Sequence, residues 1–513
     1  MSLPLNSTFI PVLLVVILLW LPAAVWAVSG NIPLDSDVYQ TLDLLVSRGL
    51  LRSHLAGTRP ITWGEANRLL EEGREKVKEW ENGDWTIPPE VRAAIRRLEK
   101  RIYDRFGRAA KAGIGSIYMM ARNPAIEFEY LDGDPSSIPG IKASQHALVY
   151  NNGGLDPDEG TGAAFTMEAQ AAAGPVLIQL FPRLSTTDED RELIHRGSLK
   201  VGGLYGLELN IARESLWWGQ GTHGGLYLTS NADPLPMVHL STPHPTALPW
   251  IFRYLGPFRF EMFVSQLEED RAVPEPYFIG IRSNFRPAYA LEVGLTMMVM
   301  TGGEGRPSVS FGDLFDILFG ENDISDDRSN KIAGLDLRLN LPGWQFYLEF
   351  AGEDEAGGAP SKMAGLAGVY FPRLTGNADL RLEYVDFAYT EELAGVWYRH
   401  GTYSDGYTYE GRTLGHHAGG GGSRDLFTEL TFGLGDYARG RLGIDLEERG
   451  IHIQPEVERH TQLSAGLERI FTLAGIDTKI GLTVAVDQVD NWNYIPGEEA
   501  TDGYVKMEIK SEI

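Results

Sequence analysis

The chain has 513 residues, of which 43% are hydrophobic and 22% are charged, and it contains no cysteine. The lack of cysteine excludes a disulfide framework, a thiolate nucleophile and any zinc or iron–sulfur site built on thiolates. The formal net charge of −25 argues against nucleic acid as a partner, because phosphate binding needs a basic surface.

The first segment, residues 1–27, carries no charged side chain and is mostly apolar. It ends with small residues at Val25 and Ala27, the two outer positions that signal peptidase reads. We therefore expect residues 1–27 to be a cleaved secretory signal peptide that exports the mature protein. Because no basic residue precedes the apolar stretch, a single N-terminal membrane anchor is the alternative, although three prolines would interrupt a spanning helix.

The next region, residues 28–112, places apolar residues at helical spacing and is predicted to be a helical domain. Thr62 and Glu65 fit a capping box that begins one helix, and Pro88 and Pro89 begin the helix after it. Lys and Arg number 15 in this region against 13 Asp and Glu, so residues 113–513 carry a net charge of −27. The last helix is basic through Arg92, Arg96, Arg97, Lys100, Arg101 and Arg105.

From about Ile114 the period of the pattern changes from 3.6 to 2, as in strands with two different faces. The alternating segments extend over about 8–11 residues, long enough for a tilted strand to cross a membrane. Their apolar faces carry large aliphatic and aromatic side chains, as a lipid-facing surface requires. Such segments lie at residues 258–265, 335–340, 344–350, 380–384, 426–432, 442–447 and 505–510.

Residues 113–513 are therefore predicted to form an all-β transmembrane barrel of about 16–18 antiparallel strands. A soluble secreted β-sandwich or propeller would show the same alternation, with its charged face outward, and is the alternative. Acids and bases are almost balanced on the polar faces of these segments, so we expect them to pair with one another inside the lumen. Most of the negative charge then falls on the loops.

Two blocks of the sequence point to a family. The first is Glu214-Ser215-Leu216-Trp217-Trp218-Gly219-Gln220-Gly221, followed by Leu228-Thr229-Ser230-Asn231-Ala232, and the second begins at Gly411-Arg412-Thr413-Leu414. In these blocks and in the order of its regions, the chain resembles the capsule assembly protein Wzi family of outer-membrane proteins. The resemblance implies an 18-stranded barrel whose helices close the periplasmic end. It also implies a lectin-like role that holds exported capsular polysaccharide on the cell surface.

Aromatic and polar residues near these blocks are candidates for binding a glycan, because an aromatic face beside hydrogen-bonding groups suits a sugar. Membership of an aromatic girdle, or a structural role in a barrel turn, is the alternative for the aromatic residues among them. The candidates are Trp217, Trp218, Gln220, Asn231, Trp397, Tyr403, Tyr407 and Arg412.

Neither a catalytic signature nor a metal motif stands out in the sequence, so we expect no enzyme activity, no cofactor and no metal. His416 and His417 are adjacent, and adjacent residues on a strand point to opposite faces, which argues against a shared metal, although a loop could turn both side chains inward. The acidic segments 156–159 and 323–327 could offer oxygen ligands to Ca²⁺, but neither has the spacing of a known calcium loop. We interpret both as solvated loops.

We therefore expect an outer-membrane protein with a periplasmic N-terminal helical domain that binds exported capsular or exopolysaccharide. The expected partners are the polysaccharide, outer-membrane lipids and lipopolysaccharide, and the capsule export machinery. The alternative is a porin or transporter for small solutes, which would need an open lumen. We expect the helical domain to close the periplasmic mouth, with its basic last helix against an acidic rim.

Overall fold

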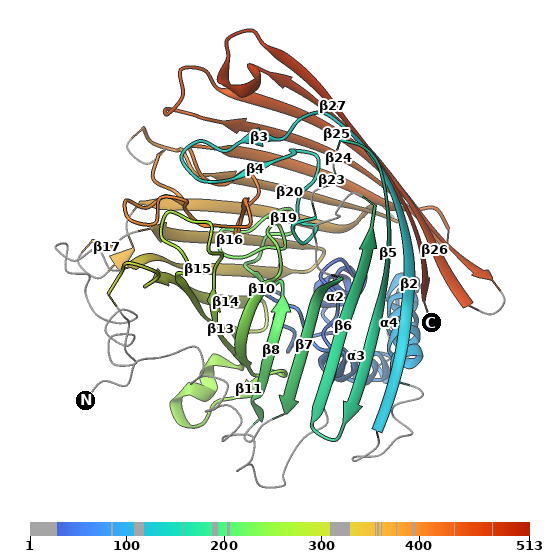
Figure 1. Ribbon diagram of the computed structural model, residues 1–513. Helices are drawn as coiled ribbons and strands as arrows, with labels where there is room; N and C mark the ends of the chain where they lie inside the picture. Colours follow the sequence, from blue (N-terminus) through green and yellow to red (C-terminus); the bar gives the residue numbers. More distant parts are fainter. Residues whose placement is uncertain are drawn as a thin grey trace.

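The fold was determined as a computed structural model (Figure 1). The predicted signal peptide lies outside the described residues, as do the acidic segments at residues 188–190 and 323–327. The structure describes residues 28–83, 86–106, 117–155, 157, 159–186, 193–202, 206–307, 329–353, 355–356, 359–360, 362–375, 377–391, 395–435, 437–473 and 476–512.

The N-terminal region folds into three helices, α2 (Val38–Ser47), α3 (Trp63–Asn82) and α4 (Pro89–Phe106). One of the two hydrogen bonds of the predicted capping box is confirmed, because the Thr62 hydroxyl accepts a hydrogen bond from the Glu65 amide at 3.1 Å. The apolar faces of the three helices pack into one core. That core includes Leu42, Leu45, Ile61, Trp63, Leu69, Leu70, Val91, Ala94 and Leu98.

The remainder of the described chain forms a closed antiparallel barrel of eighteen strands, as the resemblance implied. Closure joins the first strand to the last, with Ala125 opposite Lys510 and Asp132 opposite Gly503. The strands are β2 (Ile117–Asp132), β5 (Gly160–Ala173), β6 (Val176–Ser185), β7 (Ile194–Gly202), β8 (Glu208–Glu214), β10 (Leu235–Ser241), β12 (Pro257–Gln266), β13 (Tyr277–Ala288), β14 (Leu291–Thr301), β15 (Ser329–Leu341), β16 (Trp344–Glu353), β19 (Met363–Thr375), β20 (Ala378–Asp386), β23 (Arg424–Gly433), β24 (Ala438–Arg449), β25 (Glu458–Leu473), β26 (Ile476–Asp490) and β27 (Glu499–Glu512).

Short strands and 3₁₀ turns lie in the connections. Six of the short strands form three pairs that the site depends on, namely β1 (Thr58–Arg59) with β9 (Trp217–Trp218), β3 (Ser136–Ser137) with β4 (Ser144–Gln145), and β21 (Thr408–Tyr409) with β22 (Arg412–Thr413). Others are β11 (Thr246–Ala247), which pairs with β12, and β17 (Glu355–Ala356), which pairs with β18 (Ala359–Pro360). The 3₁₀ turns are η2 (Trp250–Leu255) and η3 (Trp492–Tyr494).

The two faces of the strands follow the predicted alternation. On β24, Leu442, Ile444 and Leu446 point outward, whereas Asp445 and Glu447 are buried inside the barrel. Outward apolar side chains of this kind match a lipid-facing surface. Several strands are longer than predicted, since β2 and β25 each have 16 residues. In the described part of the chain, no helix is both long and apolar enough to span a membrane.

The helical domain closes the end of the barrel at which the strands are joined by short turns (Figure 1). Lys100 on α4 forms an ion pair with Asp477 at the start of β26, and the Arg52 guanidinium lies 5.1 Å from the ring centre of Tyr289. Short turns face the periplasm in outer-membrane barrels. The helices therefore occupy the periplasmic mouth.

The expectation that the basic last helix lies against an acidic rim is met at Lys100, which pairs with Asp477, whereas two other bases of this helix pair elsewhere. Arg92 pairs with Glu81 at 3.6 Å, and Arg101 pairs with Asp37 at 3.1 Å, and both acids belong to the helical domain. The deepest contacts with the barrel wall come instead from α2 and from the segment of residues 54–59.

Candidate functional site

The connection between β8 and β10, residues 215–234, folds into the barrel lumen, and we call it the inner loop. Its strand β9 pairs with β1 of the helical domain, with Trp218 opposite Thr58 and Trp217 opposite Arg59. Trp218 is fully buried and donates its indole N–H to Glu261 at 2.9 Å. The inner loop and the helical domain therefore contact each other inside the barrel.

Inward-facing carboxylates of the wall hold the inner loop by its backbone. Glu349 on β16 accepts hydrogen bonds from the amides of Gln220, Gly221 and Leu226 at 2.6, 2.7 and 2.8 Å. Glu383 on β20 accepts bonds from the amides of Thr222 and His223, each at 2.9 Å. These acids thus satisfy loop amides that burial would otherwise leave without partners. Glu383 also lies 3.8 Å from Arg381, so the lumenal acids bind loop amides in addition to the expected pairing with lumenal bases.

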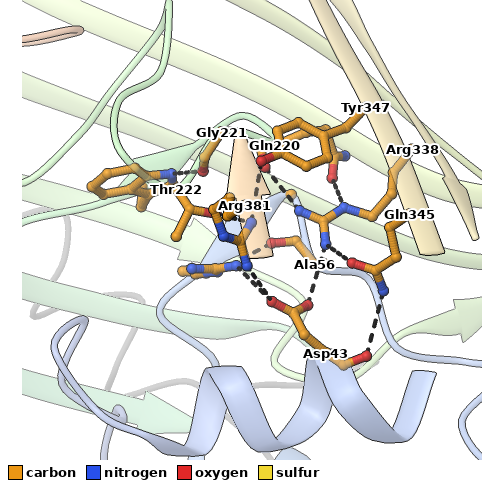
Figure 2. Close-up of polar contacts among 12 residues, drawn as sticks. Asp43, Ala56, Gln220, Gly221, Thr222, Arg338, Gln345, Tyr347 and Arg381 are labelled. Carbon is orange, nitrogen blue, oxygen red and sulfur yellow. Dashed lines mark hydrogen bonds and ion pairs between the residues drawn. The ribbon is translucent and has the colours of Figure 1, made fainter. Parts of the chain in front are cut away.

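A polar network joins the inner loop, the helical domain and the wall (Figure 2). Arg338 on β15 donates to the side-chain and backbone oxygens of Gln220, both at 2.8 Å, and to the Asp43 carboxylate at 3.2 Å. Arg381 on β20 lies 3.8 Å from the same carboxylate and donates to the Thr222 hydroxyl at 2.8 Å. Asp43, on α2, is therefore one of the points at which the helical domain is bound to the wall.

The electrostatics of Asp43 follow from these neighbours. Burial by itself raises the pKa of the Asp43 carboxyl, but the guanidinium groups of Arg338, Arg59 and Arg381 outweigh it and hold that pKa below its ordinary value. The carboxylate is therefore ionised at neutral pH, and it neutralises part of a buried positive cluster.

The long connection between β20 and β23, residues 387–423, covers the other end of the lumen, and we call it the outer cover. Tyr407 stacks on Tyr398 with ring centres 4.9 Å apart and donates its hydroxyl to the Tyr227 carbonyl at 2.7 Å. Tyr403 donates to the Gly302 carbonyl at 3.1 Å. The outer cover is thereby packed onto the inner loop and onto the end of β14.

The eight residues predicted to bind a glycan all lie in this packed interior, and none exposes more than the 6% of Trp217. Most of their polar groups bond protein partners, the indole N–H of Trp397 excepted: the Asn231 amide donates to Gln145 at 2.9 Å, and Arg412 donates to the Val149 carbonyl at 3.1 Å. In this arrangement the side chains offer no open face to a sugar. The two blocks of sequence form the framework that supports the outer surface.

An aromatic and amide-bearing surface lies on the outer connection between β26 and β27, residues 491–498, which we call the outer tip. Trp492 is half-buried, Asn493 is exposed, and Ile495 is 50% exposed. The backbone is held in place, because the Asn493 amide donates to Glu458 at 2.7 Å and the Asn491 side chain donates to the Val457 carbonyl at 3.0 Å. Asn491 and Asn493 both have positive φ, at 57° and 52°. A constrained outer turn of this kind is a place to look for recognition.

A second arrangement gathers four buried side chains inside the lumen, and we call it the His–Asp cluster. It consists of His223 of the inner loop, His417 of the outer cover, Asp425 on β23 and Asp445 on β24. Nε2 of His223 lies 3.0 Å from Asp445 and 3.2 Å from Asp425, and Nε2 of His417 lies 3.5 Å from Asp425. One potential ligand atom from each residue lies within 4.8 Å of the others.

The sequence argument against a role for the histidine pair does not apply to this geometry. His416 and His417 lie in the outer cover and not on a strand, and their rings stack with centres 4.5 Å apart. Burial, together with His416 and His223 nearby, holds the pKa of His417 well below its ordinary value, so its imidazole is neutral. The partners His223, Asp425 and Asp445 could not be found from sequence, because no local spacing connects them.

Comparisons with known proteins agree with this architecture. The family model of capsule assembly protein Wzi matches residues 135–502, from the connection after β2 into the last strand. A protein described as an uncharacterized 55.8 kDa protein in the cps region of Klebsiella pneumoniae is 32% identical over 196 residues, which cover 35% of this chain and 39% of that relative. The chain thus matches about two fifths of the length of this curated relative.

A solved structure shows the same fold over almost the whole chain. It is described as Wzi, an outer membrane protein involved in group 1 capsule assembly in Escherichia coli and a carbohydrate-binding β-barrel. The two chains share 18% sequence identity and superimpose with a TM-score of 0.70, covering 94% of this chain and 99% of that chain.

Proposed function

The chain belongs to the capsule assembly protein Wzi family, and we propose that it binds exported capsular polysaccharide and holds it at the cell surface without enzymatic activity. It is an outer-membrane β-barrel, so its long connections face the cell exterior. The relative of known structure is described as carbohydrate-binding, which supports the class of ligand.

The observation that carries this proposal is the filled lumen. Trp218 and Tyr227 of the inner loop and Trp397 of the outer cover are each 0% exposed, and the helical domain closes the periplasmic mouth. A porin or transporter for small solutes needs a passage through this space. The packing therefore favours a protein that works through its outer surface.

We propose that the outer tip is the glycan-contacting surface and that the eight buried candidates support it from within. Trp492 offers an aromatic face and Asn493 offers an amide, the combination that suits sugar C–H groups and hydroxyls. The charge of −27 on residues 113–513 would repel an acidic capsular glycan at long range, so attachment has to come from local contacts.

The test is a deletion strain complemented with variants and scored for cell-attached against shed polysaccharide. We expect the deletion to release the polysaccharide, wild type to restore attachment, and Trp492→Ala to restore it only in part. Trp250→Ala is the matched control, because Trp250 is 88% exposed at the opposite, periplasmic end of the barrel. Equal attachment in the deletion strain and in the complemented strain would contradict the function. Equal attachment with Trp492→Ala and with Trp250→Ala would contradict only the outer tip.

A further inference from the structure

The His–Asp cluster has more buried polar atoms than the protein can satisfy. Among the described residues, both carboxylate oxygens of Asp425 and of Asp445 lack a hydrogen-bond partner, as do Nε2 of His223 and both ring nitrogens of His417. Leaving one buried polar group without a partner costs about 1–3 kcal/mol, and more when the group is charged. Several such groups at one place indicate that a bound partner satisfies them.

A neighbouring histidine shows that this pattern does not arise simply from burying imidazole beside carboxylates. His460 on β25 is equally buried in the lumen, and it bonds Asp487 at 2.6 Å and Glu458 at 3.0 Å through its two nitrogens. Both ring nitrogens of His460 are therefore satisfied by the protein, and of the described atoms in this arrangement only Oδ1 of Asp487 is left without a partner. In the His–Asp cluster, by contrast, the imidazole nitrogens and carboxylate oxygens approach one another as ion pairs without hydrogen-bond geometry.

We propose that the His–Asp cluster binds one divalent metal ion of the borderline class to which Zn²⁺ belongs. Zinc lies about 2.0–2.2 Å from imidazole nitrogen and carboxylate oxygen, so the ligand atoms of a tetrahedral site are about 3.3–3.5 Å apart. The nitrogen–oxygen distances of 3.0, 3.2 and 3.5 Å in the cluster are close to that spacing.

The chemistry of the ligands selects the class of ion. Two imidazoles with two carboxylates suit Zn²⁺, whereas Ca²⁺ and Mg²⁺ prefer a shell made of oxygen. Two neighbouring carboxylates also carry a charge that a divalent cation cancels, which removes the cost of burying two like charges side by side. The four ligands come from the protein and are buried, which is the character of a structural site and not of a catalytic one.

The surroundings already fix the orientation of both imidazoles. Phe427 stacks on His223 with ring centres 3.7 Å apart, and Tyr150 stacks on His417 at 4.3 Å. The backbone of His223 is held on both sides, because its amide donates to Glu383 and its carbonyl accepts a bond from Asn151 at 2.6 Å. These contacts hold both rings in place beside the two carboxylates.

The site joins parts of the chain that are distant in sequence. His223 belongs to the inner loop, His417 to the outer cover, and the two aspartates to adjacent strands of the wall. A bound ion therefore links the inner loop and the outer cover to the barrel wall beneath the outer surface. This inference does not depend on the proposed glycan, because it concerns a buried site whose occupant is an ion.

The experiment measures metal in the full chain purified from outer membranes in detergent without chelator. We expect elemental analysis to find about one zinc ion per chain, and chelation followed by Co²⁺ to give the intense visible bands of a tetrahedral site. Asp425→Asn and His417→Gln should each lower the metal content to below about one tenth of wild type. The control His460→Gln should retain the wild-type content.

Heat-modifiable migration on gels establishes that each variant is a folded barrel before its metal is counted. A folded wild-type protein that takes up neither zinc nor cobalt would overturn the proposal. Unchanged metal content in Asp425→Asn and His417→Gln would overturn it as well. If one variant does not fold, the other variant and the cobalt spectrum of the wild type still decide. Attachment of polysaccharide is scored separately, so a failure of the proposed function leaves this result unaffected.

Discussion

Replacing Asp43 by asparagine tests the link between the helical domain and the barrel wall. The Asp43 carboxylate faces Arg338, Arg381 and Arg59 at 3.2, 3.8 and 4.0 Å. Asparagine keeps the shape of the side chain and removes its charge. Three buried guanidinium groups then lose the anion that they share.

The magnitude follows from the distances and the burial. At an effective dielectric constant of about 20, each of the three pairs contributes an attraction of about 4–5 kcal/mol before desolvation is subtracted. Removing one member of a buried ion pair costs about 3–5 kcal/mol, because the remaining charge stays buried. Such a cost raises the ratio of undocked to docked helical domain by about two to three and a half orders of magnitude.

The assay is limited proteolysis of the folded barrel in detergent, since undocking exposes the helical domain to protease. Asp37→Asn is the matched control, because Asp37 also adjoins α2 but pairs with Arg101 inside the helical domain and is partly exposed. An exposed pair contributes less than about 1 kcal/mol. If the helical domain of a folded Asp43→Asn barrel is cleaved no faster than that of Asp37→Asn, the reasoning about this ion cluster is refuted.

The dependence on pH gives a second signature of the same residue. A carboxyl with a lowered pKa contributes stability that is present above its unfolded value, about 4, and is lost as the pH falls through its folded value. We therefore expect the difference in docking stability between wild type and Asp43→Asn to be constant from about pH 5 to pH 8. It should narrow only below about pH 4.

Two further substitutions test the packed lumen. Gly219→Ala should lower the unfolding temperature, because φ is 130° and the added Cβ would lie 2.5 Å from the Glu349 carboxylate. Gly343→Ala is the control, because its φ is also positive but the space around it is open. Equal shifts of the unfolding temperature in the two variants would contradict the clash. Tyr407→Phe removes the bond to the Tyr227 carbonyl and should cost about 1–3 kcal/mol of stability while leaving glycan attachment unchanged. Loss of attachment in a variant of unchanged stability would restore Tyr407 as a direct glycan contact.

The barrel could be predicted because a strand that separates lipid from lumen leaves its pattern in the local sequence. Leu442, Ile444 and Leu446 alternate with Asp445 and Glu447 whatever the other strands do, and the same is true of the other predicted segments, which lie on β12, β15, β16, β20, β23 and β27. The capping box at Thr62 is equally local. Such features require only the nearest neighbours along the chain.

The candidate site could not be predicted in the same way, because the lumen is filled by segments from distant parts of the sequence. Trp217 and Trp218 have the composition of a sugar platform, but pairing with Thr58 and Arg59 places them in the interior. His223 meets Asp425 and Asp445 only after the barrel has closed. Burial and partnership of this kind are properties of the closed barrel and leave no periodicity in the sequence.

The contacts of the helical domain also dictate an order of assembly. Its binding surface is divided among strands that are far apart in the chain, since Asn31 contacts Glu214 on β8, Asp43 contacts Arg338 on β15, and Lys100 contacts Asp477 on β26. That surface does not exist until these strands have closed into one barrel. The domain synthesised first must therefore dock last, and an incomplete barrel cannot hold it. A docked helical domain thus indicates that all the strands it contacts have been inserted into the barrel of that molecule.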